Sequence, residues 1–479
     1  MKKPSRNPRT ALSIFQPGQN CWKISKANNV RLIIDSQQYF ADLKVALKSA
    51  REQVVLVGWD FDTRISLDGA GKGAPLGDFV WKLVQRNRNL NIYILNWNFG
   101  SIKTVFRGRM IFTLLKWMAN RRITVKFDSA HPVGASHHQK LIVIDGSLAL
   151  CGGIDVSSGR WDTREHRDEH PQRRNPDGKA YDPWHDISLA VDGKAAATLH
   201  ELAQDRWMRA TGKSLPMPQV KSKWPFEKAV STFKDTDIAI SRTRGKYDNC
   251  AEIRENEALF LDSIASARKF IYAENQYFAS KAVAAAIAKR LSAEDPPEVV
   301  IVMPEKADGW LEQVAMDTAR SQLVALIRRV DRNDRFRIYH PFTKDGAAIY
   351  VHAKLSIVDD RLLRVGSSNM NNRSMGLDTE CDLAFEGQPG DRAAAEINAI
   401  RVGLLAEHLG ADAASVQASL NHSSMIETIE KLRGEGRSLR PYVLEETTEL
   451  TEAIASQNLL DPLGEDEGEI FEKVGDARR

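Results

Sequence analysis

Apolar and polar residues form two similar series of strand-like and helix-like patterns along this chain of 479 residues. In the first series, apolar runs predict strands at 30–34, 54–59, 91–95, 123–127, 140–144 and 148–151, with helices at 39–50, 110–119 and 194–210. In the second series, strands are predicted at 238–241, 270–273, 299–303 and 335–339, with helices at 252–267, 281–291 and 311–330. Strands that alternate with helices in this way favour an α/β fold.

A lysine-rich segment with Pro216, Pro218 and Pro225 separates the two series, as expected of a linker. We therefore predict an N-terminal extension at 1–29, a first lobe at 30–212, a linker at 213–235, a second lobe at 236–410 and a tail at 411–479. The tail is helix-prone at its start and acidic later, and we expect part of it to be disordered.

The two series are copies of one unit. A shift of 214 positions places residues 138–155 on residues 352–369 without a gap, with coinciding histidine, lysine, leucine, aspartate and glycine residues. Self-similarity at a fixed offset is the mark of an internal repeat. The sequence thus predicts a duplication, with one α/β unit in each lobe.

Each copy contains the pattern His-x-Lys-x-x-x-x-Asp, and two copies in one register are a far stronger signal than one. The six residues are His138, Lys140, Asp145, His352, Lys354 and Asp359. Residues two apart in a strand share a face, so each histidine is expected to project with its lysine. Each aspartate falls where its strand turns, where it is better placed to orient or cap than to attack a substrate.

Two histidines and two lysines at one site suit the cleavage of a phosphodiester. Lysine supplies positive charge to phosphoryl oxygens. One neutral imidazole can attack phosphorus while the other, protonated, donates to the leaving oxygen. This chemistry needs no metal and no cofactor, and we predict neither.

Charge is unevenly distributed along the chain. The net charge is +4, and residues 412–479 carry −8, so residues 1–411 carry +12. A basic body suggests an anionic partner such as phosphate, nucleic acid or an acidic lipid surface.

Other features of the sequence bear on compartment. The four cysteines have neither disulfide-scaffold nor zinc-site spacing. No apolar run is long enough for a signal peptide or a transmembrane helix. We expect a cytoplasmic protein, peripheral to the inner face of the membrane.

The paired motif and its flanks resemble the phospholipase D superfamily over about residues 30–405. In the first half the similar segments are Gly58-Trp59-Asp60-Phe61-Asp62, Gly152-Gly153-Ile154-Asp155, Gly159 to His166, Pro183-Trp184-His185-Asp186 and Arg206-Trp207. In the second half they are Glu274 to Phe278, Gly366-Ser367-Ser368-Asn369, Asn372 to Met375 and Asp378-Thr379-Glu380. The resemblance implies a monomer of two α/β/α sandwich lobes with mixed β-sheets and the active site between the lobes.

The resemblance also implies roles for individual residues. His138 would be the nucleophile, forming a covalent phosphohistidine, and His352 the acid/base, although the sequence leaves their order open. Lys140, Lys354 and Asn369 would hold phosphoryl oxygens. Asp155 occupies the position of Asn369 in the first repeat, where a carboxylate suits orientation of a neighbour or the substrate's other end.

Further candidates have structural alternatives. Ser367, Glu380 and His185 are candidates for substrate binding, but Glu380 could instead orient a histidine and His185 could belong to a packed core cluster. His137 adjoins His138 but lies out of register with Lys140. Four strand-end aromatic residues suit acyl chains or ordinary packing: Trp59, Phe61, Tyr277 and Phe278.

We therefore predict a phospholipase D that hydrolyses the headgroup phosphodiester of a glycerophospholipid, or transfers the phosphatidyl group to a primary alcohol. The alternatives are a phosphatidyltransferase of the cardiolipin synthase type, a nuclease of the same superfamily, and a non-catalytic protein that binds anionic membranes. The expected partners are the lipid, water or an alcohol and an anionic membrane surface, without an obligatory nucleic acid.

Overall fold

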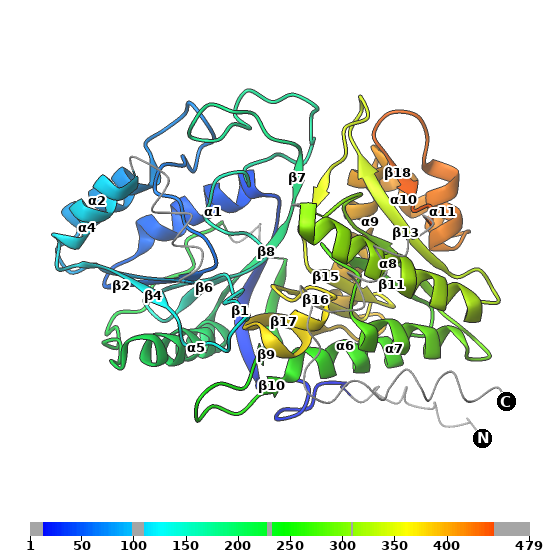
Figure 1. Ribbon diagram of the computed structural model, residues 1–479, viewed down its shortest axis with the longest axis horizontal. Coiled ribbons are helices and arrows are strands. Elements are labelled where there is room, and N and C mark those ends of the chain that lie inside the picture. Colours follow the sequence, from blue (N-terminus) through cyan, green and yellow to red (C-terminus); the bar gives the residue numbers. More distant parts are fainter. Residues whose placement is uncertain (1–12, 98–109, 228–231, 308–309, 445–479) are drawn as a thin grey trace, which may run out of the picture.

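The computed structural model describes residues 13–97, 110–227, 232–307 and 310–444, and its centre is one 16-stranded mixed sheet (Figure 1). The first half contributes β1 (Lys23–Ile34), β2 (Gln53–Gly58), β3 (Asn91–Trp97), β4 (Ile123–Asp128), β5 (Leu141–Ile144), β6 (Leu148–Gly152) and β8 (Ile187–Asp192). The second half contributes β9 (Phe233–Arg244), β10 (Ile253–Arg254), β11 (Phe270–Glu274), β12 (Glu298–Val302), β13 (Phe336–Phe342), β15 (Leu355–Val358), β16 (Leu362–Gly366), β17 (Glu380–Glu386) and β18 (Ser438–Pro441). A separate small sheet pairs β7 (Trp184–His185) with β14 (Tyr350–Val351) in parallel.

The strand order repeats from one half to the other. From the centre outward, the first half runs β1-β8-β6-β5-β2-β3-β4 and the second runs β9-β17-β16-β15-β11-β12-β13, followed by β18. The corresponding strands occur in the same order along the chain, so the predicted duplication and fold class are confirmed. The two halves are joined because β1 and β9 pair antiparallel from Lys23 with Ile240 to Val30 with Phe233.

Both central strands are longer than predicted. β1 begins at Lys23, where strand 30–34 was expected, and β9 begins at Phe233, inside the segment expected to be linker. Buried and exposed positions alternate at the start of β1, so this part contains no apolar run. Pairing with the other half of the sheet, rather than local hydrophobicity, extends these strands.

Helices cover both faces of the sheet (Figure 1). They are α1 (Ser36–Ser49), α2 (Leu76–Arg86), α4 (Met110–Met118), α5 (Gly193–Thr211), α6 (Glu255–Ser266), α7 (Lys281–Leu291), α8 (Trp310–Val330), α9 (Arg392–Leu409), α10 (Ala413–Leu420) and α11 (Met425–Leu432), with a π-helix at Arg373–Leu377. One core joins α5, α9, α10 and α11 to strands of both halves, and separate cores lie under α1 and α2 and under α6 to α8. The result is a three-layer α/β/α arrangement.

The segment after residue 410 differs in part from the expected tail. It forms α10 and α11 and then β18, which pairs with the edge of β13. The acidic residues from 445 onward lie outside the described residues. Within the part of the chain that the structure describes, no helix has both the length and the apolar character needed to cross a bilayer.

Gly152 and Gly366, which coincide under the shift of 214, show how closely the repeat is preserved. A Cβ on Gly152 would lie 2.5 Å from the Cα of Ser188, and one on Gly366 would lie 2.5 Å from the Cα of Asp382. Only glycine allows the neighbouring strand to approach this closely. The same close packing therefore follows the motif strands in both halves.

Candidate active site

The two motif histidines meet where the halves of the molecule face each other. His138 precedes β5 and His352 lies between β14 and β15, and their ring centroids are 6.5 Å apart. Lys140 donates from Nζ to the carbonyl of His138 at 2.8 Å, and Lys354 donates in the same way to the carbonyl of His352. Each lysine is thus held beside the histidine two residues before it, and both pairs share one site.

Each histidine is held by a carboxylate from the other half of the chain. Nδ1 of His138 lies 3.0 Å from both carboxylate oxygens of Glu380, at the start of β17. Nδ1 of His352 lies 2.7 Å from Oδ2 of Asp186, which joins β7 to β8. With Nδ1 occupied, Nε2 is the nitrogen that can meet a substrate. Neither half is a complete site without the other.

Backbone hydrogen bonds between the halves position these two carboxylates. The amide N–H of His138 donates to the carbonyl of Thr379 at 3.0 Å, and that of His352 donates to the carbonyl of His185 at 2.7 Å. Thr379 and His185 immediately precede Glu380 and Asp186. Since β17 and β8 hold equivalent places in the two halves, one backbone arrangement positions both carboxylates.

Burial and neighbouring charge keep the histidines neutral. Burial, together with the positive charges of Lys140 and Lys354, holds the pKa of His138 and of His352 well below its ordinary value. Burial raises the pKa of Glu380 to about 8 and that of Asp186 to about 7. It lowers the pKa of Lys354 to about 7. A bound phosphodiester would bring a negative charge close to these groups. That charge would raise the pKa values of the imidazoles and of Lys354 and so favour their protonated forms.

The two lysines have different surroundings. Nζ of Lys354 donates to Oε1 of Gln276 at 3.2 Å, and Nδ2 of Asn369 donates to the same oxygen at 3.4 Å. Nζ of Lys140 lies 3.4 Å from Oδ2 of Asp155. The second half thus offers neutral partners where the first offers a carboxylate.

Asp155 also holds the loop beside the first half-site. Its Oδ1 accepts from the backbone N–H of Trp59 at 3.3 Å and of Asp60 at 3.4 Å. The structure therefore places Asp155 where it orients neighbours, one of the two roles expected of it.

The motif aspartates do not join the histidines. Asp145 lies past the far end of β5, where its carboxylate accepts from the backbone N–H groups of residues 51, 52 and 53 and from Oγ of Ser222. Asp359 lies past the far end of β15 and accepts from the N–H groups of residues 268, 269 and 270. Both anchor the start of the adjacent strand, β2 or β11. They belong to the framework of the site and make no contact with the histidines.

Ser367 and Glu380, which were candidates for substrate binding, form a buried network next to His138. Ser367 donates from Oγ to Glu380 and accepts from the N–H of Cys381 at 3.0 Å. Ser374 donates to the other oxygen of Glu380 at 2.7 Å. Ser367 and Glu380 are both fully buried, so they position His138 rather than line the entrance.

His185 and His137 belong to buried networks. His185 is fully buried, and its Nε2 lies 2.8 Å from Oε2 of Glu274, so of the two places predicted for it the structure shows the packed core cluster and not a surface that meets substrate. Nδ1 of His137 lies 3.0 Å from Oγ1 of Thr379, and its Nε2 lies 3.1 Å from Oδ1 of Asp128. Burial lowers the pKa of His137 to about 4. The side chain of His138, not that of His137, faces His352.

Three residues that the structure brings to the centre have no site role predicted from their sequence pattern. They are Asp186, Gln276 and Trp184, whose ring lies 5.0 Å from that of His352. The guanidinium of Arg160 lies over the ring of Trp184, 4.1 Å from its centroid. Asp186 and Trp184 stand in a segment already singled out for its resemblance, and the equivalence of β8 and β17 would have pointed to Asp186.

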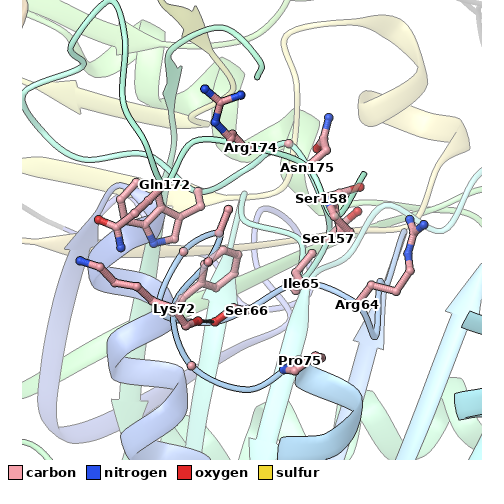
Figure 2. Close-up of a pocket in the computed structure, with 18 of the residues that line it drawn as sticks. Arg64, Ile65, Ser66, Lys72, Pro75, Ser157, Ser158, Gln172, Arg174 and Asn175 are labelled. Carbon is pink, nitrogen blue, oxygen red and sulfur yellow. Dashed lines mark hydrogen bonds between the residues drawn. The ribbon is translucent and has the colours of Figure 1, made fainter. Parts of the chain in front are cut away.

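A cavity of about 720 Å³ lies in the first half, among residues 63–78 and 157–181 (Figure 2). Its wall includes Arg64, Lys72 and Arg174 as cationic side chains, and Ser157, two residues after Asp155. No motif histidine or lysine lines it. The cavity is therefore a neighbour of the reaction centre and not the place where the histidines meet.

Known proteins resemble this chain in sequence and in fold. Phospholipase D A of Dictyostelium discoideum is 24% identical, with 74% of this chain and 32% of that protein covered. Phospholipase D alpha 3 of Arabidopsis thaliana is 25% identical, and the match covers 76% of this chain and 62% of that protein. The chain thus spans 32% of the length of the first relative and 62% of the length of the second, less than two thirds of either.

A solved structure described as phosphatidylserine synthase of Haemophilus influenzae Rd KW20 shares the fold. It has a TM-score of 0.58 and 11% identity, with 91% of this chain and 95% of that one covered.

A family model described as Phospholipase D matches residues 46–294 and 326–473. The match runs beyond residue 405, where the resemblance was expected to end. The duplicated sheet, the paired motif and this match agree, and the chain belongs to the phospholipase D family.

Proposed function

We propose that this chain is a phospholipase D that cleaves the headgroup phosphodiester of glycerophospholipids to phosphatidic acid and an alcohol. The observation that carries the proposal is the pair of histidines at 6.5 Å, each held at Nδ1 by a carboxylate of the other half. Two imidazoles with free Nε2 atoms and two lysines supply a nucleophile, an acid and positive charge for one phosphoryl group.

The proposed reaction has two displacements at phosphorus. Nε2 of His138 attacks, the bond between phosphorus and the headgroup oxygen breaks, and the leaving alcohol takes a proton from Nε2 of His352. Water then gives a proton to His352 and attacks phosphorus, which breaks the bond to His138 and releases phosphatidic acid. Lys140, Lys354 and Asn369 hold the phosphoryl oxygens through both steps.

An alcohol could replace water in the second step and give phosphatidyl transfer. Both reactions use the same covalent phosphohistidine, so the acceptor, and not the catalytic residues, distinguishes phospholipase from phosphatidyltransferase. A nuclease would use these residues on a nucleic acid phosphodiester. One chain supplies both half-sites, which supports a monomer as the active unit.

The direct test is to incubate the purified chain with vesicles of phosphatidylcholine or phosphatidylethanolamine in the presence of ethanol. We expect phosphatidic acid and phosphatidylethanol, identified by mass spectrometry. Cleavage of single-stranded or double-stranded nucleic acid without either lipid product would overturn the proposal. The same assay in water alone measures hydrolysis against transfer.

We also propose that the protein contacts anionic membranes peripherally through α4. Phe112 and Leu115 on this helix are 70% and 56% exposed, and exposed apolar side chains of this size suit the lipid interface. Replacing both with aspartate should reduce sedimentation with phosphatidylglycerol vesicles and leave hydrolysis of a water-soluble short-chain lipid unchanged. Unchanged sedimentation would exclude α4 as the contact.

A further inference from the structure

Four titratable side chains meet in the interior, behind the second half-site. Asp35 precedes α1, His166 lies in the loop between β6 and β7, His185 is in β7 and Glu407 is in α9. All four are buried, and one atom from each lies within 4.8 Å of the others. Three of them belong to the first half, whereas Glu407 comes from the last long helix of the second.

The distances within this cluster are those of ligands around a common centre. Nδ1 of His185 lies 2.9 Å from Oδ1 of Asp35 and 3.2 Å from Oε1 of Glu407. Nε2 of His166 lies 3.1 Å from Oε1 of Glu407 and 3.5 Å from Oδ2 of Asp35. Bonds of about 2.0–2.1 Å to a tetrahedral zinc ion place its ligand atoms about 3.3 Å apart.

Hydrogen bonding does not account for the whole arrangement. Among the described residues, Nδ1 of His185 has no hydrogen-bond partner, although two carboxylates lie next to it. Oδ2 of Asp35, which lies 3.5 Å from Nε2 of His166, is also buried without a hydrogen bond. Buried polar atoms are almost always satisfied, so these two indicate a missing occupant of the space between them.

The remaining atoms of the cluster are held as metal ligands commonly are. Nδ1 of His166 lies 3.0 Å from Oδ2 of Asp162, and Nε2 of His185 lies 2.8 Å from Oε2 of Glu274. A histidine that binds a metal through one nitrogen usually donates from the other to a carboxylate, which fixes the ring. Glu407 pairs with Arg164 through its second oxygen. Each of these three ligands therefore has an orienting partner.

The backbone at Asp35 adds an independent sign. Its φ is 65°, a left-handed conformation that few residues other than glycine adopt. Asp35 is the N-cap residue of α1, yet its side chain makes no capping hydrogen bond. Aspartate is a favoured cap, so turning it inward gives up a stabilising hydrogen bond at the start of the helix. A strained backbone and a forgone cap are expected where a side chain serves a binding site.

We propose that Asp35, His166, His185 and Glu407 bind one divalent transition-metal ion, and that Zn²⁺ fits best. Two imidazole nitrogens with two carboxylates match zinc and its neighbours, whereas Mg²⁺ and Ca²⁺ prefer all-oxygen sites.

The surrounding charges favour a cation. Four carboxylates surround the centre, and three arginines, Arg164, Arg173 and Arg437, pair with them. Apart from the two histidines, the four carboxylates exceed the three arginines by one negative charge.

The ion would join the two halves and support the acid/base from behind. The carbonyl of His185 accepts from the N–H of His352, and the next residue, Asp186, holds Nδ1 of His352. The four ligands come from separate segments, and none of their side chains is hydrogen-bonded to a motif histidine or lysine among the described residues, so the site is structural. Metal binding is independent of the proposed lipid reaction, and either can fail alone.

Metal analysis of the untagged full chain tests the proposal. After exhaustive dialysis we expect about one zinc per chain by plasma mass spectrometry, and visible absorption bands of tetrahedral Co²⁺ after exchange. Asp35→Asn and His166→Ala should each lower the metal content at least tenfold. His200→Ala is the matched control, because His200 is equally buried and pairs with Gln53, outside the cluster. It should keep the metal.

Two results would overturn the proposal. One is a folded wild-type chain with no bound metal that takes up neither Zn²⁺ nor Co²⁺, which would leave a network of protonated histidines. The other is a full metal complement in both ligand variants. If the variants fail to fold, the wild-type metal content and a fall in melting temperature on chelation decide, since neither needs a substitution.

Discussion

The two half-sites have one framework and different chemistry. In both, a histidine precedes a motif strand, its lysine binds the histidine carbonyl, and a carboxylate crosses from the other half. The side chain of His138 is 15% exposed and that of His352 only 6%. Lys140 has a carboxylate nearby, where Lys354 has amides. The two imidazoles thus share one framework and have different neighbours, as the proposed division into a nucleophile and an acid requires.

The largest expected effect comes from removing one histidine at a time. His138→Ala should abolish turnover, because no phosphohistidine can form. His352→Ala should lose about 10²–10⁴-fold on a natural lipid, the usual contribution of a general acid. A lipid with p-nitrophenol as its leaving group needs no acid in the first displacement, so it should restore to His352→Ala a rapid first release of about one p-nitrophenol per active site, and none to His138→Ala.

Rates of p-nitrophenol release from the two variants measure this difference. The wild-type chain on both substrates is the control for altered binding. Rescue of His138→Ala instead would reverse the assigned roles, and rescue of neither would reject a division of labour between the histidines.

Removing the carboxylate that holds each histidine should have the second-largest effect. Glu380→Gln and Asp186→Asn should each lower kcat by about 10²-fold or more, because each leaves a histidine without its orienting partner. Both changes should lower the pKa of the histidine concerned, because a carboxyl group can ionise beside a protonated imidazole and stabilise it, whereas an amide cannot. A nucleophile must be neutral, so Glu380→Gln should move the acid limb of the pH profile to lower pH. An acid must be protonated, so Asp186→Asn should move the alkaline limb to lower pH.

Profiles of kcat against pH for the two variants decide whether the halves differ in this way. A shift of the same limb in both would contradict the separate roles. Ser374→Ala is a milder control on the first half, because it removes one hydrogen bond to Glu380 and keeps the carboxylate.

The contacts of Glu380 and Asp186 with the histidines of the opposite half could not be predicted from the sequence. Local patterns predicted helix 281–291 with its observed bounds, and the shift of 214 aligned the motifs. The shift cannot align Asp186 with Glu380, because 34 residues separate β6 from β8 and 13 separate β16 from β17. His138 and Glu380 are 242 residues apart. Contacts across the halves depend on how the two sheets join at β1 and β9, which no local pattern encodes.

Stability should separate the motif aspartates from the histidines. Asparagine tolerates the positive φ of 47° at Asp145 and 56° at Asp359, so Asp→Asn isolates the hydrogen bonds. Each change should lower the free energy of unfolding by about 1–3 kcal/mol, because three backbone N–H groups lose a charged acceptor. Asp145→Asn should lower the free energy of unfolding more than Asp359→Asn, since Oγ of Ser222 is a fourth donor to Asp145.

Urea unfolding followed by circular dichroism measures the loss, and kcat of the folded enzyme is the control. We expect kcat to stay within a few-fold of wild type in both variants. A fall of 10²-fold in kcat without a loss of stability would place the aspartates in the chemistry after all.

The smallest effect concerns the residue at which the two repeats differ. Asp155→Asn gives the first half the amide of the second and removes a carboxylate from beside the phosphate. KM should fall a few-fold, because repulsion of the anion is relieved. The carboxylate raises the pKa of His138, so its removal should move the acid limb to lower pH. The reverse change, Asn369→Asp, adds repulsion beside Lys354 and should raise KM. If both variants raise KM alike, Asp155 serves mainly to hold the N–H groups of Trp59 and Asp60, and the difference between the repeats is structural rather than electrostatic.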